Sequence, residues 1–175
     1  GYSLETSRAA DRTALPRRRC GMLDDTDRAI LAQLIEDGTR SNRTVAEAIG
    51  VSQGTVSNRV KRLEELGVIR GYTAHIDPEK VGWRITVVVG IRIEKGRLLE
   101  IQGRIAEDPR VISVYDVTGD YDSMVIALAK DREDLNDLTK TVLSIDGIER
   151  SHTHMVLNTV KESKIQMPKI HEDGA

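Results

Sequence analysis

The first helix that the sequence predicts covers residues 24–37. Its apolar residues recur at intervals of three or four, the spacing that places them on one face of a helix. Asp24, Asp25 and Asp27 stand at its beginning, where negative charge is favourable beside the helix dipole. Gly38 is expected to end the helix. The folded chain should therefore begin with an amphipathic helix that has one buried face.

Two shorter helices are expected next, separated by a glycine. Ser41-Asn42 offers an N-cap for the first and Ser52 for the second, which Gly67 closes. Gly50 lies between them and permits the positive φ that a tight connection requires. The buried residues are expected to be Val45, Ala46 and Ile49 in the first helix, and Val56, Val60 and Leu63 in the second. Two helices joined at a glycine turn, with a small residue at the crossing, form the helix-turn-helix pattern.

After Gly67 the spacing of apolar residues changes. Residues 68–76 are expected to form a strand that serves as a wing or as a linker between two domains, and Asp77-Pro78 ends it. Over residues 83–94 apolar side chains fill every second position, which is the period of a strand. This change of period predicts a second, sheet-containing domain.

The second half of the chain predicts a ferredoxin-like domain. Gly119-Asp120 marks the turn of a hairpin, and Asp131 offers an N-cap for a later helix. After the strand over 83–94, the expected elements are a helix over 98–105, strands over 111–118 and 123–129, a helix over 131–145 and a strand over 148–160. The order β-α-β-β-α-β predicts one four-stranded sheet with both helices on the same face.

The other face of this sheet is expected to meet a partner. It carries apolar residues too, among them Val88 and either Val114 or Tyr115. An apolar sheet face that no helix covers is most simply buried against a second copy of the chain. The pattern therefore predicts a dimer formed through the sheet.

Composition excludes several classes of protein. The length of 175 residues suits one large domain or two small ones, and 31% charged and 39% hydrophobic residues are typical of a globular protein. No apolar run approaches the roughly 20 residues of a membrane helix. The single cysteine, Cys20, excludes an intramolecular disulfide framework and a multi-cysteine zinc site. We expect a cytoplasmic protein with no membrane partner and no cofactor.

Residues 1–21 differ from the rest of the chain. Five arginines against two acidic residues give this segment a charge of +3, whereas the whole chain has a charge of −2. We favour an expression remnant that precedes a native start at Met22; the alternative is a basic arm that contacts DNA phosphates. Because the bulk charge is slightly negative, nucleic-acid binding has to be inferred from local placement.

The third predicted helix carries candidate DNA contacts on the side away from its apolar stripe. Gln and Asn suit adenine edges, Arg suits guanine, and Thr can meet a thymine methyl group. Ser52 and the free N–H groups beside it suit phosphate. The alternative is a solvated polar face, but the preceding helix and the Gly50 turn favour binding of double-stranded DNA. The candidates are Ser52, Gln53, Thr55, Asn58, Arg59 and Arg62.

In this arrangement the sequence resembles the Lrp/AsnC, or feast/famine, family of bacterial and archaeal transcriptional regulators. The resemblance covers residues 22–165 and rests on four segments in order: LDDTDRAILAQLIEDGTRSN, TVAEAIGVSQGTVSNRVKRLEELGVI, RGYTAHIDPEKVG and TGDYDSMV. It implies an α+β protein with an N-terminal winged-type helix-turn-helix, a linker strand and a ferredoxin-like RAM-type domain. It also implies dimers, often assembled into octamers, that bind promoter DNA under the control of an amino acid or related metabolite.

The resemblance completes the predicted division of the chain. The parts are the remnant or arm at 1–21, a helix-turn-helix domain at 22–67, a linker strand and hinge at 68–82, an effector-binding and oligomerisation domain at 83–162, and a polar C-terminal tail at 163–175.

Residues 118–122 match the family's Gly-Asp-aromatic-Asp turn, which lines the effector site between protomers. Two carboxylates at a hairpin can accept hydrogen bonds from an ammonium group, and N–H groups near Gly119 can meet a carboxylate. A plain polar turn is the alternative. The candidate effector residues are Gly119, Asp120, Tyr121, Asp122, Ser151 and Thr153.

Two alternatives remain for other residues and for the function. His152 and His154 share a strand face and could bind a metal; we favour ordinary strand or interface histidines, because no nearby carboxylate or cysteine completes a ligand set.

A siroheme-decarboxylase-like enzyme subunit is the alternative function on the same architecture. Such an enzyme does not require a DNA-reading helix, so the polar face of the third helix favours a regulator without enzymatic activity.

Overall fold

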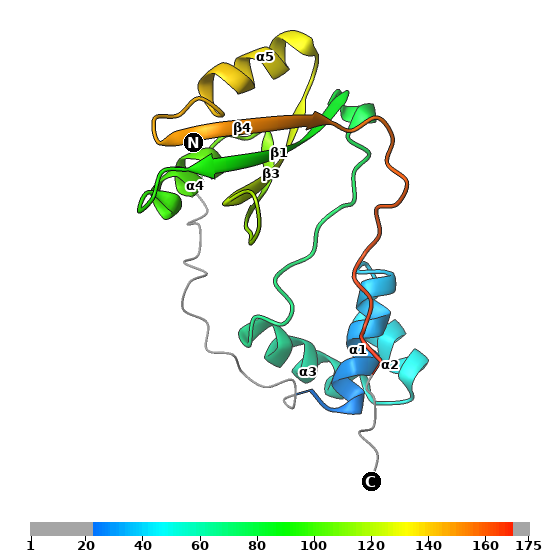
Figure 1. The fold of residues 1–175 in the computed structure, drawn as a ribbon. Helices are drawn as coiled ribbons and strands as arrows, with labels where there is room; N and C mark the ends of the chain where they lie inside the picture. The colour runs from blue at the N-terminus through cyan, green and yellow to red at the C-terminus, as the bar shows by residue number, and fades with distance from the viewer. Residues whose placement is uncertain (1–22, 170–175) are drawn as a thin grey trace, which may run out of the picture. The chain divides into compact units, whose positions relative to one another are not determined.

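The computed structural model describes residues 23–169 (Figure 1). They form two compact units, a helical unit of residues 23–73 and 163–169 and a sheet unit of residues 74–162. The prediction for residues 1–21 lies outside this described range. No helix within it is long and apolar enough to cross a membrane.

Three helices build the helical unit, and each starts at a side-chain cap. They are α1 (Asp25–Glu36), α2 (Asn42–Ile49) and α3 (Gln53–Glu65). The side chains of Asp24, Ser41 and Ser52 accept backbone N–H groups of the first turns. Gly50 ends α2 with a φ of +75°, a left-handed conformation that favours glycine. The predicted helix-turn-helix is confirmed.

The apolar stripes of the three helices meet in one core. Ala46 is 3% exposed and belongs to this core, as expected for the small residue of the helix-turn-helix pattern. The buried members are Ile30, Leu31, Val45, Ala46, Val56, Val60 and Leu63. This aliphatic core fixes the orientation of α3, the helix expected to contact DNA.

Residues 68–76 do not form a strand in the single chain. The first two N–H groups of this segment both donate to the Leu63 carbonyl, at 2.9 and 3.1 Å, and the Tyr72 hydroxyl donates to Glu64 at 3.1 Å. The start of the segment therefore packs back onto the helical unit. A strand requires a neighbouring ladder, and none of residues 68–76 is assigned to one.

The sheet unit has the predicted β-α-β-β-α-β order. Its four strands are antiparallel to their neighbours and lie in the order β2-β3-β1-β4. A short 3-10 helix, η2 (Glu79–Val81), precedes them. The elements are β1 (Ile85–Ile93), α4 (Leu98–Ala106), β2 (Val111–Asp116), β3 (Ser123–Ala129), α5 (Arg132–Thr141) and β4 (Ile148–Met155).

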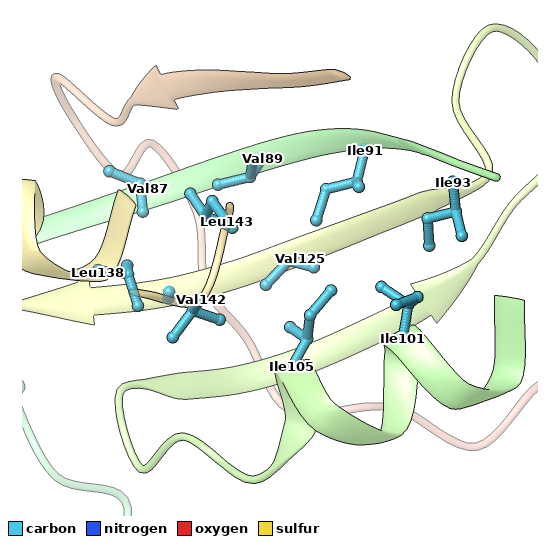
Figure 2. Close-up of a cluster of buried hydrophobic side chains, with 11 residues drawn as sticks. Val87, Val89, Ile91, Ile93, Ile101, Ile105, Val125, Leu138, Val142 and Leu143 are labelled. Atoms are coloured by element: carbon cyan, nitrogen blue, oxygen red, sulfur yellow. The ribbon is translucent and has the colours of Figure 1, made fainter. Parts of the chain in front are cut away.

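Both helices pack on one face of this sheet. Figure 2 shows side chains from α4 and from the end of α5 meeting alternate residues of β1 and β3. The buried cluster contains Val87, Val89, Ile91, Ile93, Ile101, Ile105, Val125, Ala127, Leu138, Val142 and Leu143. The face predicted from the period-two pattern is therefore the buried one.

The opposite face carries a second set of apolar side chains, which we call the open face. Tyr115 lies on it, since its partner in β3 is Met124, whereas Val114 pairs with buried Val125 on the helix side. This settles which of the two residues faces away from the helices. The larger apolar residues of the open face are Val88, Tyr115, Met124, Ile126 and Leu128.

The last strand is shorter than predicted. It ends at Met155 rather than Val160: Met155 pairs with Val87 in the last rung of the ladder, and the Val156 N–H still donates to the Thr86 carbonyl at 2.9 Å. Leu157 and Val160 are 94% and 92% exposed. Their apolar character extended the sequence pattern beyond the end of the sheet.

A half-buried arginine joins the start of β2 to α5. The Arg110 guanidinium contacts the carboxylates of Asp108, Asp134 and Asp137 at 2.7 to 3.0 Å. The hydrogen bond that Arg110 donates to Asp108 is the main reason why the pKa of Asp108 is lowered. The pKa of Asp134 is lowered first by the Lys130 backbone N–H and then by Arg110.

These pKa values predict how acid destabilises the sheet unit. Because both carboxyls titrate below their usual value of 3.8 when folded, their contribution is complete above that pH and is lost as the pH falls further. Arg110→Met should lower the free energy of unfolding by about 1–3 kcal/mol at pH 7 and by less at pH 3. Urea unfolding followed by Trp83 fluorescence measures this, with the exposed Arg132→Met as control. An equal loss at both pH values would contradict it.

Candidate DNA interface and ligand site

Arg59 and Arg62 contact α1 instead of extending freely from α3. Arg59 donates to Asp27 at 3.1 Å and also to the Asp24 carboxylate, and Arg62 donates to the other oxygen of Asp27 at 3.1 Å. Asp27 is 1% exposed. A buried carboxylate is tolerated only when it is paired and hydrogen-bonded, so the two guanidinium groups compensate its charge. Both predicted DNA contacts therefore also hold α3 against α1.

The pKa values of these groups agree with this role. The Arg59 hydrogen bond, followed by the Asp27 backbone N–H, holds the pKa of Asp24 below its usual value. The hydrogen bonds to Asp24 and Asp27 raise the pKa of Arg59 in turn. The Arg59–Asp24 pair is thus charged at neutral pH.

Ser52 and Thr55 stabilise the first turn of α3. The Ser52 hydroxyl accepts the Thr55 N–H at 3.1 Å, and the two side-chain oxygens lie 2.8 Å apart. Their hydroxyls thus already have partners. The remaining N–H groups at the start of a helix lack intrahelical acceptors and suit a phosphate.

The side of α3 opposite its buried stripe carries Gly54 and Asn58, one helical turn apart. Both residues are exposed, as are Gln53 and Lys61 beside them. Nothing but the Ser52 hydroxyl, at 3.9 Å, lies near the position of a Cβ on Gly54, so the helix surface is flat there. The sequence predicted Gln53 and Asn58 but not Gly54, whose missing side chain gave no chemical signal.

Asp122 of the predicted effector turn forms hydrogen bonds to the backbone of β1. Its N–H donates to the Ile91 carbonyl at 2.9 Å, and its carboxylate accepts the Ile93 N–H at 2.8 Å. The side chain therefore extends the β1–β3 pairing beyond the end of the ladder. An ammonium group at this carboxylate would compete with the Ile93 N–H.

Tyr121 lies on the open face, over Gly90 of β1. A Cβ at Gly90 would come within 2.7 to 2.8 Å of the Tyr121 ring, so a glycine is needed beneath it. The Tyr121 hydroxyl and His152 Nδ1 share a hydrogen bond of 2.7 Å. The two rings are arranged edge to face, with their centroids 5.8 Å apart. Asp120, next to Tyr121, is exposed and has no hydrogen bond or ion pair to any described residue.

Ser151 and Thr153 are not on the same face as Tyr121. They pair with Ile91 and Val89, whose side chains point toward the helices, whereas His152 pairs with Gly90. The structure thus separates two of the six candidate effector residues from the others. Sequence reasoning missed Gly90 and His152, because the relative register of β1 and β4 is not visible in the sequence.

Two arginines stand side by side on the open face. Arg92 and Arg150 are directly paired across β1 and β4. Like charges in such a position repel each other. One guanidinium nitrogen of Arg92 lies 3.7 Å from Asp122, whereas no ion pair of Arg150 occurs among the described residues. The local excess of positive charge favours a bound anion.

His154 also lies on the open face, as predicted from its spacing to His152. It pairs with Val88 across β1. In the part of the chain that the structure describes, no three His, Cys, Asp or Glu side chains gather as metal ligands would. His152 already shares a hydrogen bond with Tyr121.

Comparison with known proteins agrees with both units. Residues 23–70 match a winged helix-turn-helix DNA-binding domain, and residues 86–166 match the Lrp/AsnC ligand binding domain. An uncharacterised HTH-type transcriptional regulator of Pyrococcus furiosus is 47% identical over 140 residues, which cover 80% of this chain and 95% of that protein. The chain belongs to the Lrp/AsnC family. It is a transcriptional regulator with a DNA-binding and a ligand-binding domain.

Two further relatives of this Lrp/AsnC regulator carry more specific names. The HTH-type transcriptional regulator FL11 of Pyrococcus furiosus is 37% identical, over 82% of this chain and 95% of FL11. A transcriptional regulator of Neisseria meningitidis, solved in complex with L-Met, is 28% identical with a TM-score of 0.77, over 83% of this chain and 96% of that one. These relatives are named as regulators and not as enzymes, so nothing in the comparisons supports the decarboxylase alternative.

Proposed function

We propose that this Lrp/AsnC regulator reads operator DNA through the outward side of α3. The observation that carries the proposal is that different residues of this helix face α1 and the outside. Arg59 and Arg62 hold buried Asp27, while Asn58 and Gly54 face outward beside Gln53. An asparagine can bond an adenine edge in two places, and a glycine lets the backbone approach the groove. Operator binding by the Asn58→Ala variant tests this proposal.

We further propose that the open face is the dimer interface. Its residues Val88, Met124, Ile126 and Leu128 are only partly buried in a single chain. Burial of such a stripe against its copy removes apolar surface from water, and a twofold axis makes the patch self-complementary. The segment 68–76, which carries a strand pattern in its sequence, would pair with its equivalent. Octamers would be built from these dimers.

An arginine on the open face should break this dimer. Ile126→Arg places a charge at the centre of the apolar stripe, and burial of an unpaired charge is costly. We expect the sedimentation coefficient to change from that of a dimer to that of a monomer at micromolar concentration. The control is Leu99→Arg, since Leu99 is 69% exposed on α4. A wild-type monomer, or an Ile126→Arg dimer, would contradict the interface.

We propose that the effector is an amino acid or a similar small zwitterion, bound beside Tyr121. Asp120 would accept the ammonium group, and Arg150 with the N–H groups near Gly119 would bind the carboxylate. Support comes from the unpaired Asp120, from the adjacent Arg92 and Arg150, and from the L-Met complex of the related Neisseria protein. Ser151 and Thr153 face the helix side, so they would act only through the position of β4.

Gly90→Ala tests this site without removing any of its functional groups. The added methyl group would overlap the Tyr121 ring, so the ring must move and lose its contact with His152. We expect at least about a tenfold loss of affinity, for the amino acid that most raises the melting temperature of the wild type. Isothermal titration calorimetry measures it, and Gly103→Ala, where nothing lies within 4 Å, is the matched control. Unchanged affinity in Gly90→Ala would place the ligand elsewhere.

A further inference from the structure

Residues 163–169 belong with the helical unit and not with the sheet unit that precedes them. Residues 163–169 have no regular secondary structure, yet they group with the three helices (Figure 1). Their composition gave no sign of this, because the segment is short, polar and without a helical or strand period.

A lysine of this segment contacts the end of α1. Lys164 Nζ donates to the Glu36 carbonyl at 3.0 Å. The last carbonyls of a helix lack intrahelical donors, and they form the negative end of its dipole. α1 has no basic residue in its own last turn. Lys164 therefore supplies the cation that this helix end lacks.

A methionine of the same segment packs on the helical core. Met167 is partly buried against the cluster of α1, α2 and α3 side chains. With Ile165 and Pro168 it lines an apolar groove of about 740 Å³, which Leu31 and Leu34 of α1 line as well. Ile165 itself is 80% exposed, so the segment is held by Met167 and Lys164.

We propose that residues 163–169 are a docked strap, which completes the flank of α1 and ties the DNA-binding unit to the last strand of the sheet. β4 carries His152 of the proposed ligand site and ends at Met155. The chain from there to Lys164 spans about 30 Å when fully extended. Together with the linker at 68–82, the strap gives the DNA-binding unit a second covalent connection to the sheet unit. Movement of β4 beyond the reach of this connection would detach Lys164 and Met167 from α1.

Hydrogen exchange measured by mass spectrometry tests the docking without DNA or ligand, so its outcome is independent of the proposed effector site. A chain that ends after Glu162, and the double variant Lys164→Ala, Met167→Ser, should both exchange the last turn of α1 about tenfold faster than the wild type. Peptides from β1 and β3 should exchange at the wild-type rate. Leu157→Ser, at a side chain that is 94% exposed, is the control. It should leave the exchange rates of α1 and of the β1 and β3 peptides unchanged.

Unchanged exchange in α1 of both variants would overturn the strap. Faster exchange accompanied by dissociation of an oligomer in sedimentation would overturn it as well, since the segment would then belong to an interface between copies. Faster exchange in α1 at an unchanged sedimentation coefficient is the result that supports docking within one chain.

Discussion

Replacing both Arg59 and Arg62 by alanine should markedly lower the free energy of unfolding of the helical unit. The two guanidinium groups are the cations that contact buried Asp27. Without them its carboxylate would lack a paired cation in a site that is only 1% exposed. Since a small domain is stable by only about 5–15 kcal/mol, the loss should be visible as a much lower melting temperature.

Circular dichroism during thermal unfolding measures this change, and Lys61→Ala is the matched control. Lys61 is an exposed cation on the same helix, and substitutions at such positions usually change stability by less than about 0.5 kcal/mol. If the double arginine variant had the same melting temperature as the Lys61 control, the contacts to Asp27 would not contribute to stability. Both arginines would then act as DNA contacts only.

The second large effect is expected for operator binding. Asn58→Ala should weaken binding to a mapped operator by about 1–3 kcal/mol, or roughly 5- to 150-fold in Kd. Its stability should stay that of the wild type, because Asn58 is exposed and opposite the core of α3. Fluorescence anisotropy titration at fixed salt measures the affinity. A phosphate contact alone would weaken operator and unrelated duplex equally, which would contradict base reading.

Arg59→Ala differs from Asn58→Ala in a way the sequence could not show. On sequence grounds both residues lie on the exposed face and only binding should suffer. The structure adds a cost in stability for Arg59, because its partner Asp27 is buried. Binding data for Arg59→Ala therefore have to be compared at temperatures where the variant is folded.

Helices and strands could be predicted from the sequence because each has a period of its own. The stripe of α3 and the alternation of β1 appear in the structure as predicted, with the caps at Ser41 and Ser52. The ends of elements depend on pairing between strands: β4 stops at Met155, in the last rung of its ladder with β1, although the apolar pattern continues to Val160. The same dependence explains why 68–76 carries a strand pattern without being a strand in one chain.

The ligand site was the least predictable part. The turn at Gly119 and Asp120 is a local signal, so it could be located from the sequence. Which side chains of β4 accompany it depends on the pairing of β4 with β1, and this placed His152 rather than Ser151 next to Tyr121. The contact between Asp27 and α3 likewise depends on how the helices cross, which no single helix reveals.

Selection of bound sequences from a pool of randomised duplexes tests the central claim most directly, with the wild type and the double variant Gln53→Ala, Asn58→Ala compared at the same salt. We predict that the wild type enriches a defined operator with two related half-sites, and that the variant enriches none while it keeps its fold and its weak, salt-dependent DNA binding. If the variant enriched the same sequence as the wild type, the outward side of α3 would not be the surface that reads DNA.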